Sequence, residues 1–360
     1  MSTSTVESAK SGLSRRRVIT AGAAASGALI GSALAGAPAS PASVTDSVPT
    51  APTGARILRP RRLRPGDRVR VVSPGSTPQR ANVARGVEIL ESWGLVVEIA
   101  PHVFDQYGYL AGRDEDRLAD LNDALADPTI RGVFASRGGY GTQRIVDAVN
   151  INAVRRDPKV VVGFSDITSL QNKLWRDTRL ATIHGPMVNW SDSRTGPESA
   201  EALRAAVMTT SQIVIQREET ESTASIVVPG RAEGILLGGN LTMLDSSVAA
   251  GDFPDLTGAI LFIEEVGEAP YRIDRMLSHL RRIGALDGIV GVALGQVTDS
   301  EGDNWTFVDT LRDRLCDLGV PVLGGLRLGH GNGQLTIPLG VPAVLDADAG
   351  VLIAEPAVRD

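Results

Sequence analysis

The sequence predicts a two-domain α/β protein, with a parallel-sheet α/β domain first and a smaller domain of mixed α/β structure after it. Short apolar runs alternate with helical patterns from residue 58 onward, which is typical of parallel sheets. The length of 360 residues suits two domains. A polar stretch at 191–225, with weak periodicity, divides the pattern. We therefore expect an N-terminal domain at 58–190, a connector at 191–225 and a C-terminal domain at 226–360.

The N-terminal domain repeats a strand followed by a helix. Apolar, β-branched runs predict strands at 69–75, 95–101, 132–139 and 160–163. Helical patterns lie between them, at 83–94, 114–127 and 142–149, and a further helix follows residue 165.

The C-terminal domain shows a different pattern. Apolar runs occur at 231–244, 259–266 and 288–297, and an amphipathic helix is expected at 272–284. Alternating apolar residues around an Asp-Ala-Gly turn predict a terminal hairpin at 341–356. Because the two domains differ in design, we expect the active site in the cleft between them.

The first forty residues have the features of an export signal. Arg15–Arg17 precede an apolar run of Ala, Gly and Leu, and small residues allow cleavage after Ala35, Ala37 or Ala39. Paired arginines indicate the twin-arginine type, which exports folded proteins. The apolar run of about 15 residues is shorter than the ~20 that a membrane anchor needs. The mature protein is therefore expected in the periplasm, the cell wall or the medium, without stable membrane insertion.

Composition excludes several classes of protein. Residues 1–40 hold four basic residues and one acidic residue, so the 36 basic and 42 acidic residues of the whole chain become 32 and 41, a net charge of −9. That charge disfavours nucleic acid as a partner. The single cysteine, Cys316, can form no internal disulfide, and no Cys-x-x-Cys or His-Glu-x-x-His spacing occurs. We predict no metal and no cofactor. Residues 41–57, rich in Pro, Ser, Thr and Ala, are expected to form a disordered linker.

Ser165 lies where the run Val160–Val162 turns through Gly163 into a helix. A serine on such an elbow exposes its hydroxyl, and the next backbone N–H can stabilise an oxyanion. The pattern departs from Gly-x-Ser-x-Gly, because Ile167 stands in place of the second glycine. A helix cap, formed by Ser165 or Asp166, is the competing interpretation.

A second glycine-rich turn spans Ser136–Val146. Gly138 and Gly139 allow backbone N–H groups to approach an anion. The turn lacks the Lys-Ser/Thr of a Walker loop and the dinucleotide fingerprint. It is interpreted as an oxyanion-hole wall, a phosphate cradle or a plain tight turn.

A serine nucleophile needs a base, and the chain has four histidines. His279 lies in an amphipathic helix and His102 follows Pro101, so both are assigned to packing or the surface. His184 ends a strand and could line the site. His330, between glycines in a loop of the second domain, is the best candidate base.

The base in turn needs a carboxylate that orients it. Glu264 and Glu265 end the same apolar strand, and only one can face the cleft because successive side chains alternate. Glu264 is preferred because it is the first to break the apolar run, and Glu265 remains possible.

Seven blocks, in order along residues 58–355, together resemble the LD-carboxypeptidase family of serine peptidases, which includes muramoyltetrapeptide carboxypeptidase and the microcin C immunity peptidase. The blocks are YLAGRDEDRLADLNDALADP, RGGYG, GFSDIT, IHGPM, GILLGGNLTML, LFIEEVGEAPYRIDRML and GHGNGQLTIPLGVPAVLD.

The resemblance implies a triad of Ser165, Glu264 and His330. It also implies an oxyanion hole from the backbone N–H of Asp166 and of Gly138 or Gly139, no metal, and a homodimer. Phe164 departs from the Tyr or Asn that the family often has beside the nucleophile.

The resemblance also implies release of the terminal D-alanine from peptidoglycan tetrapeptides at an L-to-D bond, and the export signal favours this wall substrate. Arg113, Arg137 or Arg272 could hold the free α-carboxylate of that substrate, with solvated surface arginine as the alternative. The alternative functions are an immunity-type amidase acting on peptidyl or aminoacyl nucleotides, and a secreted muropeptide-binding protein without activity.

Overall fold

The computed structural model describes residues 56–302 and 304–360. The chain divides into units 1–50 and 51–360, and every described residue belongs to the second unit. The predicted export signal lies outside the described residues, and so does the predicted linker up to residue 55. Within the described ranges, no helix is long and apolar enough to cross a membrane.

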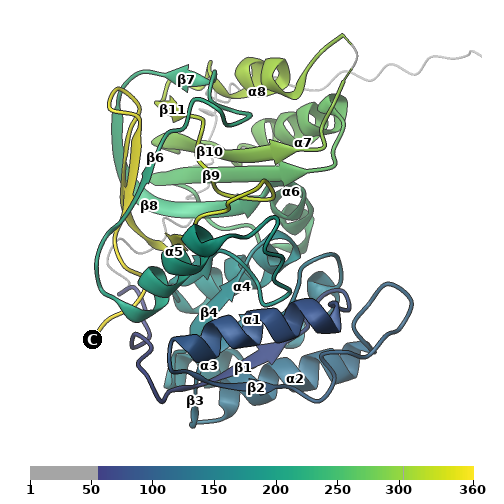
Figure 1. Ribbon diagram of the computed structural model, residues 1–360. Coiled ribbons are helices and arrows are strands. Elements are labelled where there is room, and N and C mark those ends of the chain that lie inside the picture. The colour runs from purple at the N-terminus through teal and green to yellow at the C-terminus, as the bar shows by residue number, and fades with distance from the viewer. Residues whose placement is uncertain (1–55, 303) are drawn as a thin grey trace, which may run out of the picture. The chain divides into compact units, whose positions relative to one another are not determined.

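The first sheet has six strands in the order β12-β5-β4-β3-β1-β2 (Figure 1). Five of them run parallel, which confirms the predicted parallel sheet. The sixth, β12, comes from the C-terminal region and pairs antiparallel with β5, with Ile337 opposite His184. The strands are β1 (Arg68–Val72), β2 (Val96–Ile99), β3 (Ile130–Ala135), β4 (Val160–Gly163), β5 (Thr182–His184) and β12 (Ile337–Leu339).

Helices cover both faces of this sheet, as right-handed crossovers between parallel strands require. Helix α2 packs on β1 and β3 and contacts α3, which in turn contacts α4, so these three helices share one face. The helices are α1 (Arg80–Ser92), α2 (Asp114–Ala126), α3 (Ile151–Arg156), α4 (Thr168–Thr178) and α5 (Pro197–Met208).

The helix predicted at 142–149 is wrong. The chain instead forms two 3₁₀ turns there, η1 (Thr142–Arg144) and η2 (Val146–Ala148). Two anchors explain the difference, because the backbone N–H of Thr142 is taken by the side chain of Asp166 at 2.9 Å and Asn150 already caps α3. Between these anchors the chain closes two short 3₁₀ turns in place of one continuous helix.

The second sheet has eight strands in the order β6-β14-β13-β8-β9-β10-β11-β7. Strands β8 to β11 are parallel, the added strands on both sides are antiparallel, and the predicted terminal hairpin is β13 and β14. Strand β6 comes from the segment expected to be a connector. The strands are β6 (Ile213–Gln216), β7 (Val227–Val228), β8 (Arg231–Asn240), β9 (Ala259–Val266), β10 (Gly291–Thr298), β11 (Val322–Leu323), β13 (Val341–Asp346) and β14 (Val351–Ala354).

Three helices pack beside the second sheet, α6 (Leu241–Ala250), α7 (Pro270–Arg282) and α8 (Phe307–Leu315), and Figure 1 shows them on the same side of β9 and β10. They enclose one apolar cluster. A second cluster joins the first sheet to the other face of the second, with Phe134 and Val161 on one side and Leu236 and Phe262 on the other. The two sheets therefore share a core, which fixes residues at their adjoining edges.

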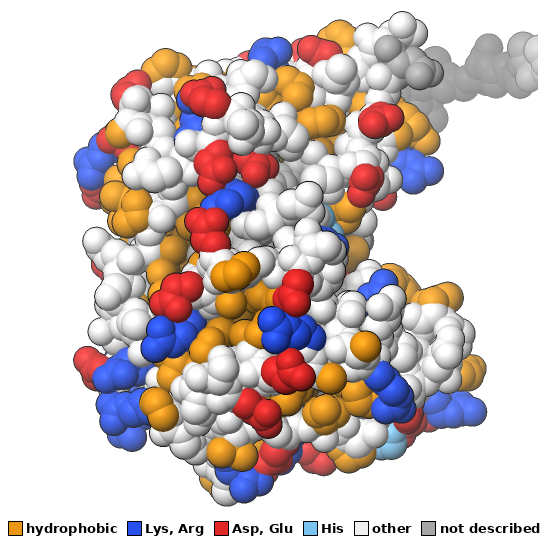
Figure 2. Space-filling view, viewed as in Figure 1, with side chains coloured by type: hydrophobic (Ala, Val, Ile, Leu, Met, Phe, Trp, Pro, Cys, Tyr) orange, Lys and Arg blue, Asp and Glu red, His pale blue; other side chains and the backbone are white. Residues whose placement is uncertain are grey.

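Acidic and basic side chains are interspersed over the face shown in Figure 2, and basic side chains form no continuous stripe on it. A stripe of that kind is the electrostatic footprint of a protein that binds nucleic acid.

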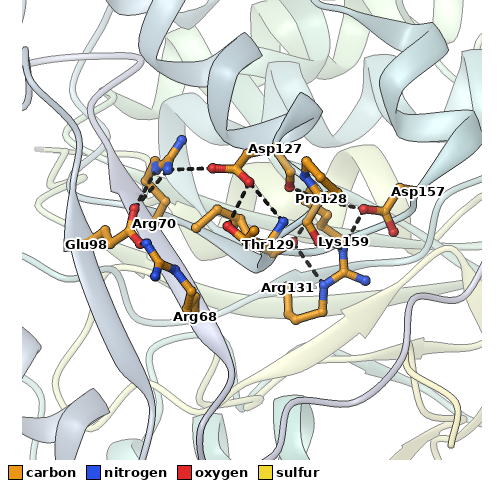
Figure 3. Close-up of polar contacts among 10 residues, drawn as sticks. Arg68, Arg70, Glu98, Asp127, Pro128, Thr129, Arg131, Asp157 and Lys159 are labelled. Atoms are coloured by element: carbon orange, nitrogen blue, oxygen red, sulfur yellow. Dashed lines mark hydrogen bonds and ion pairs between the residues drawn. The ribbon is translucent and has the colours of Figure 1, made fainter.

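An ion-pair network joins strands of the first sheet (Figure 3). Arg70 donates to Glu98 and Asp127, at 2.8 and 2.9 Å. The buried Lys159 donates to the carbonyl groups of Asp127 and Ile130, both at 2.8 Å, and to the carboxylate of Asp157 at 2.7 Å. These contacts fix the amino ends of β1, β3 and β4, whereas Ser165 follows the carboxyl end of β4.

Candidate active site

Ser165 occupies a strained corner between β4 and α4, in the 3₁₀ turn η3 (Ser165–Ile167). Its φ of 63° is left-handed, a conformation that costs a non-glycine residue on the order of 1–3 kcal/mol. The corner is tight, because a Cβ on Gly163 would lie 2.7 Å from the side chain of Ile167. Neither η3 nor α4 has a side-chain cap, so the capping interpretation of Ser165 and Asp166 is wrong.

Three side chains form a hydrogen-bonded chain at this corner. Nε2 of His330 lies 3.0 Å from Oγ of Ser165, and Nδ1 of His330 lies 2.6 Å from Oε2 of Glu264. His330 comes from the loop between β11 and β12, Glu264 from the carboxyl end of β9, and Ser165 from the end of β4. The structure thus brings together the three residues predicted from opposite halves of the chain.

The two adjacent glutamates of β9 have different environments. Glu264 is fully buried against His330. Glu265 faces the other way, accepting from the Asn240 side chain at 3.0 Å and from the backbone N–H of Thr242, in the first turn of α6, at 2.7 Å. Only Glu264 can orient the imidazole.

The two carboxyl groups also titrate differently. Burial alone would raise the pKa of Glu264, but the charge of His330 and its hydrogen bond outweigh burial and hold that pKa below the ordinary value. Burial dominates at Glu265 and raises its pKa. Glu264 is therefore the carboxylate that stays ionised beside an imidazolium.

The glycine-rich turn lies directly against the serine. A Cβ built on Gly138 would be 3.1 Å from Oγ of Ser165 and 3.4 Å from the backbone N of Asp166. None of the described residues accepts a hydrogen bond from the backbone N–H of Gly138, Gly139 or Asp166. These donors beside Ser165 suit an oxyanion, so the turn is more than a plain tight turn.

Two buried charged residues hold that turn in place. Asp166 accepts from both the backbone N–H and the hydroxyl of Thr142, at 2.9 and 2.6 Å, and burial raises the pKa of its carboxyl group. The guanidinium of Arg117 donates to the carbonyl of Gly141 at 3.0 Å, and also to that of Pro74. These supports have no local sequence signature, since they join segments distant in the chain.

A row of tilted and edge-to-face aromatic rings packs against the imidazole of His330. The ring of Phe164 lies 4.8 Å from that of His330 and 5.6 Å from that of His184, which packs 4.9 Å from Phe262. His184 has no exposed surface, and burial lowers its pKa to about 4. The expectation that His184 lines the site is wrong, because Phe164 separates it from His330.

A cavity of about 500 Å³ opens beside Ser165 and His330. Two arginines, Arg137 and Arg194, line it, and none of its lining residues is Asp or Glu. The remaining lining residues are polar, glycine or apolar: Gln79, Asn82, Gly138, Gly139, Phe164, Pro186, Met187, Asn189, Ser191, Thr195, Val266 and Gln334.

Only one of the three arginines predicted to bind substrate lines this cavity. Arg137 does, and its Nη1 donates to the carbonyl of Thr77 at 3.2 Å. Arg113 instead lies over the ring of Tyr107, and Arg272, on α7, contacts Tyr271 and Glu268. Arg194 also lines the cavity, although the sequence predicts only a connector for its polar segment.

The remaining histidines lie on other parts of the surface, as expected. His102 pairs with Asp105 at 2.8 Å and His279 with Asp245 at 2.6 Å, and neither lines the cavity. The hydroxyl of Ser165 is hydrogen-bonded to the imidazole of His330, which is hydrogen-bonded to Glu264. In this arrangement the imidazole can activate the hydroxyl for attack on a carbonyl carbon.

The chain is similar to known proteins along most of its length. Residues 69–185 match the family model of the LD-carboxypeptidase N-terminal domain, and residues 233–345 match that of its C-terminal domain. A carboxypeptidase-like protein of Streptomyces coelicolor is 42% identical over 82% of this chain and 96% of its own length. A Bacillus subtilis protein named for carboxypeptidase action on murein peptides is 33% identical over 84% and 96%.

A solved structure shares the fold. It is that of a microcin C7 self-immunity protein in complex with aspartyl sulfamoyl adenosine, with a TM-score of 0.75 and 24% identity. It covers 84% of this chain and 100% of that one.

Proposed function

The chain belongs to the LD-carboxypeptidase family of serine peptidases, and we propose that it releases the terminal D-alanine from peptidoglycan tetrapeptides by hydrolysing an L-to-D amide bond. The observation that carries the proposal is the continuous chain from Oγ of Ser165 through His330 to the buried Glu264. In a serine peptidase these three groups act as nucleophile, base and orienting acid.

In the first half of the reaction, Nε2 of His330 takes the proton of Ser165 as its Oγ attacks the scissile carbonyl carbon. Glu264 holds the tautomer with the proton on Nδ1 and stabilises the imidazolium that forms. The carbonyl oxygen becomes an oxyanion, which accepts from the backbone N–H of Asp166 and of Gly138 or Gly139. Each such donor is worth about 100- to 1000-fold in rate.

As the C–N bond breaks, His330 gives its proton to the nitrogen of the leaving D-alanine, and an acyl-enzyme remains on Ser165, which completes the first half. His330 then activates a water that hydrolyses the ester. The strain at Ser165 supports this role, since strained backbone persists at functional sites where the surrounding structure holds it.

The choice of a wall peptide as substrate rests on two supports. The Bacillus subtilis relative, similar in sequence along nearly its whole length, is named for murein peptides. The export signal expected at residues 1–40 would carry the protein to the wall, where the nucleotide antibiotics of the alternative function do not act. The alternative function has one support, the fold shared with the immunity protein, and hydrolysis of aminoacyl-nucleotide analogues tests it.

The deciding experiment incubates purified protein with a diamino-acid-containing tetrapeptide and follows the loss of one alanine by mass spectrometry. Ser165→Ala should abolish the loss while circular dichroism stays unchanged. Binding of the peptide without cleavage by the wild type would favour the non-catalytic alternative. Cleavage of an aminoacyl sulfamoyl nucleoside in place of the tetrapeptide would favour the immunity-type amidase.

Export and assembly complete the proposal. The protein leaves the cytoplasm through the twin-arginine route, binds no nucleic acid and forms a homodimer, as its signal, its acidity and its family resemblance suggest. Replacing Arg15 and Arg16 by lysine should keep a fusion protein in the cytoplasm. Light scattering measures the assembly, and a monomer mass at micromolar concentration would contradict the dimer.

A further inference from the structure

The cavity beside Ser165 is positively charged, although the protein as a whole is acidic. Its lining includes Arg137 and Arg194 but no Asp or Glu, whereas the chain carries a formal net charge of −6. Across the described residues, no ion pair engages either guanidinium. A cavity with two cations that lack acidic partners suits an anionic ligand.

The two arginines come from different segments of the cavity wall. Arg137 directly precedes Gly138 in the glycine-rich turn, on the side of the oxyanion donors. Arg194 belongs to the segment between β5 and α5, and its carbonyl accepts from the backbone N–H of Gly333 at 2.8 Å. That bond ties Arg194 to the loop that carries His330.

Arg194 lines the cavity together with His330 and is hydrogen-bonded to the loop that carries this residue. His330 must deliver a proton to the leaving nitrogen, so the departing residue lies next to the imidazole. The terminal residue of a free peptide has an α-carboxylate within one residue of that nitrogen. We propose that Arg194 binds this α-carboxylate and so restricts the enzyme to the last residue of its substrate.

The surroundings of Arg194 favour such a contact. Although the residue is exposed, nearby protein removes water from its guanidinium and lowers its pKa, and the negative charges of Glu264 and Asp299 act in the opposite direction. A partly dehydrated guanidinium binds a carboxylate more strongly than a fully hydrated one. Its planar fork can also hold both carboxylate oxygens at once.

The inference rests on the proposed function, and its test compares two forms of one tetrapeptide, one ending in free D-alanine and one in D-alanine amide. The amide retains the scissile bond but has lost the carboxylate. The wild type should prefer the free acid by about 10- to 100-fold in kcat/KM, the value of a hydrogen-bonded charge pair. Arg194→Gln should reduce this ratio to about one, mainly through KM, and Arg194→Lys should restore part of it.

Two control variants test whether the preference for the free acid depends on Arg194 specifically. Arg113→Gln changes an exposed arginine that lies outside the cavity, and it should keep the wild-type rate and the wild-type ratio. Arg137→Gln should keep the preference for the free acid, because Arg137 lies on the oxyanion side. The proposal is overturned if Arg194→Gln lowers both rates equally, or if Arg137→Gln rather than Arg194→Gln removes the preference.

Failure of the proposed function would look different, since the wild type would then cleave neither peptide. In that event isothermal titration calorimetry tests the role of Arg194. It measures the affinity of Ser165→Ala and of the double variant Ser165→Ala/Arg194→Gln for both peptides. Tighter binding of the free acid that disappears in the double variant supports the role of Arg194. Equal affinities for the two peptides in Ser165→Ala overturn it.

Discussion

Nδ1 of His330 lies 2.6 Å from Oε2 of Glu264, a carboxylate with no solvent exposure. The buried carboxylate of Glu264 therefore fixes the position of the imidazole through Nδ1, on the side of the ring away from Ser165. Phe164 packs against the same ring, 4.8 Å away, so the base has little freedom to turn away from Ser165. Electrostatics and packing together hold the base in one orientation before substrate arrives.

Glu264→Gln should lower kcat by about 10⁴-fold, since an amide can neither fix the tautomer of His330 nor stabilise its charged form. Steady-state kinetics on the tetrapeptide measures this. Glu265→Gln is the matched control, because this neighbouring carboxylate binds Asn240 and the start of α6 instead. Its kcat should stay within a few fold of the wild-type value, and its free energy of unfolding should fall by about 1–3 kcal/mol. Equal losses of activity in both variants would contradict the assignment of Glu264.

Gly138→Ala should reduce kcat by about 100-fold or more, with the fold intact. The new methyl group would lie 3.1 Å from Oγ of Ser165 and occupy the space that the developing oxyanion needs. Gly196→Ala is the control, because nothing lies within 4 Å of a Cβ at that position, and it should behave as wild type. Unchanged kcat in Gly138→Ala would remove this turn from the oxyanion hole.

His184 should make the stability of the protein depend on pH. Its pKa is about 4 in the fold and 6.5 ordinarily, so the unfolded chain binds a proton more readily. The contribution is fully present above pH 6.5 and is lost as pH falls through 4, to a total of about 3 kcal/mol. Urea unfolding between pH 7 and 4 measures it. His184→Leu should show a shallower fall, and an identical pH profile in both proteins would contradict this account.

Lys159→Met should destabilise the protein by about 3 kcal/mol without changing kcat. The substitution removes a buried ammonium that donates to two carbonyl groups and to the carboxylate of Asp157, so each of these buried acceptors loses one of its donors. Thermal unfolding and tetrapeptide kinetics measure the two effects. A large loss of activity in the folded variant would show that the ion-pair edge of the sheet communicates with Ser165.

The sequence predicted the parts of the site that have local signatures. Ser165 followed a run of valines at a strand end, His330 stood between glycines, and strand alternation separated Glu264 from Glu265. The first sheet was predictable for the same reason, because parallel strands that are buried on both faces appear as continuous apolar runs.

Features that depend on distant contacts were not predictable. Arg194 has no local signature, and only the fold brings its polar segment beside the cavity. The role of His184 was misjudged because strand position does not reveal that Phe164 and Phe262 enclose its ring. The 3₁₀ turns at 142–149 depend on Asp166, a residue more than twenty positions away. Tertiary contacts override helical propensity at such sites.

The pairing of β12 with β5 has a consequence for when activity can arise. Residues 337–339 complete the sheet that carries Ser165, and they follow His330 by only a few positions. A chain still leaving the ribosome at residue 320 has its nucleophile but lacks its base. Such pairing between remote segments is a slow step of folding. Synthesis and folding must therefore be nearly finished before hydrolysis can begin, which protects the cell from a half-made peptidase.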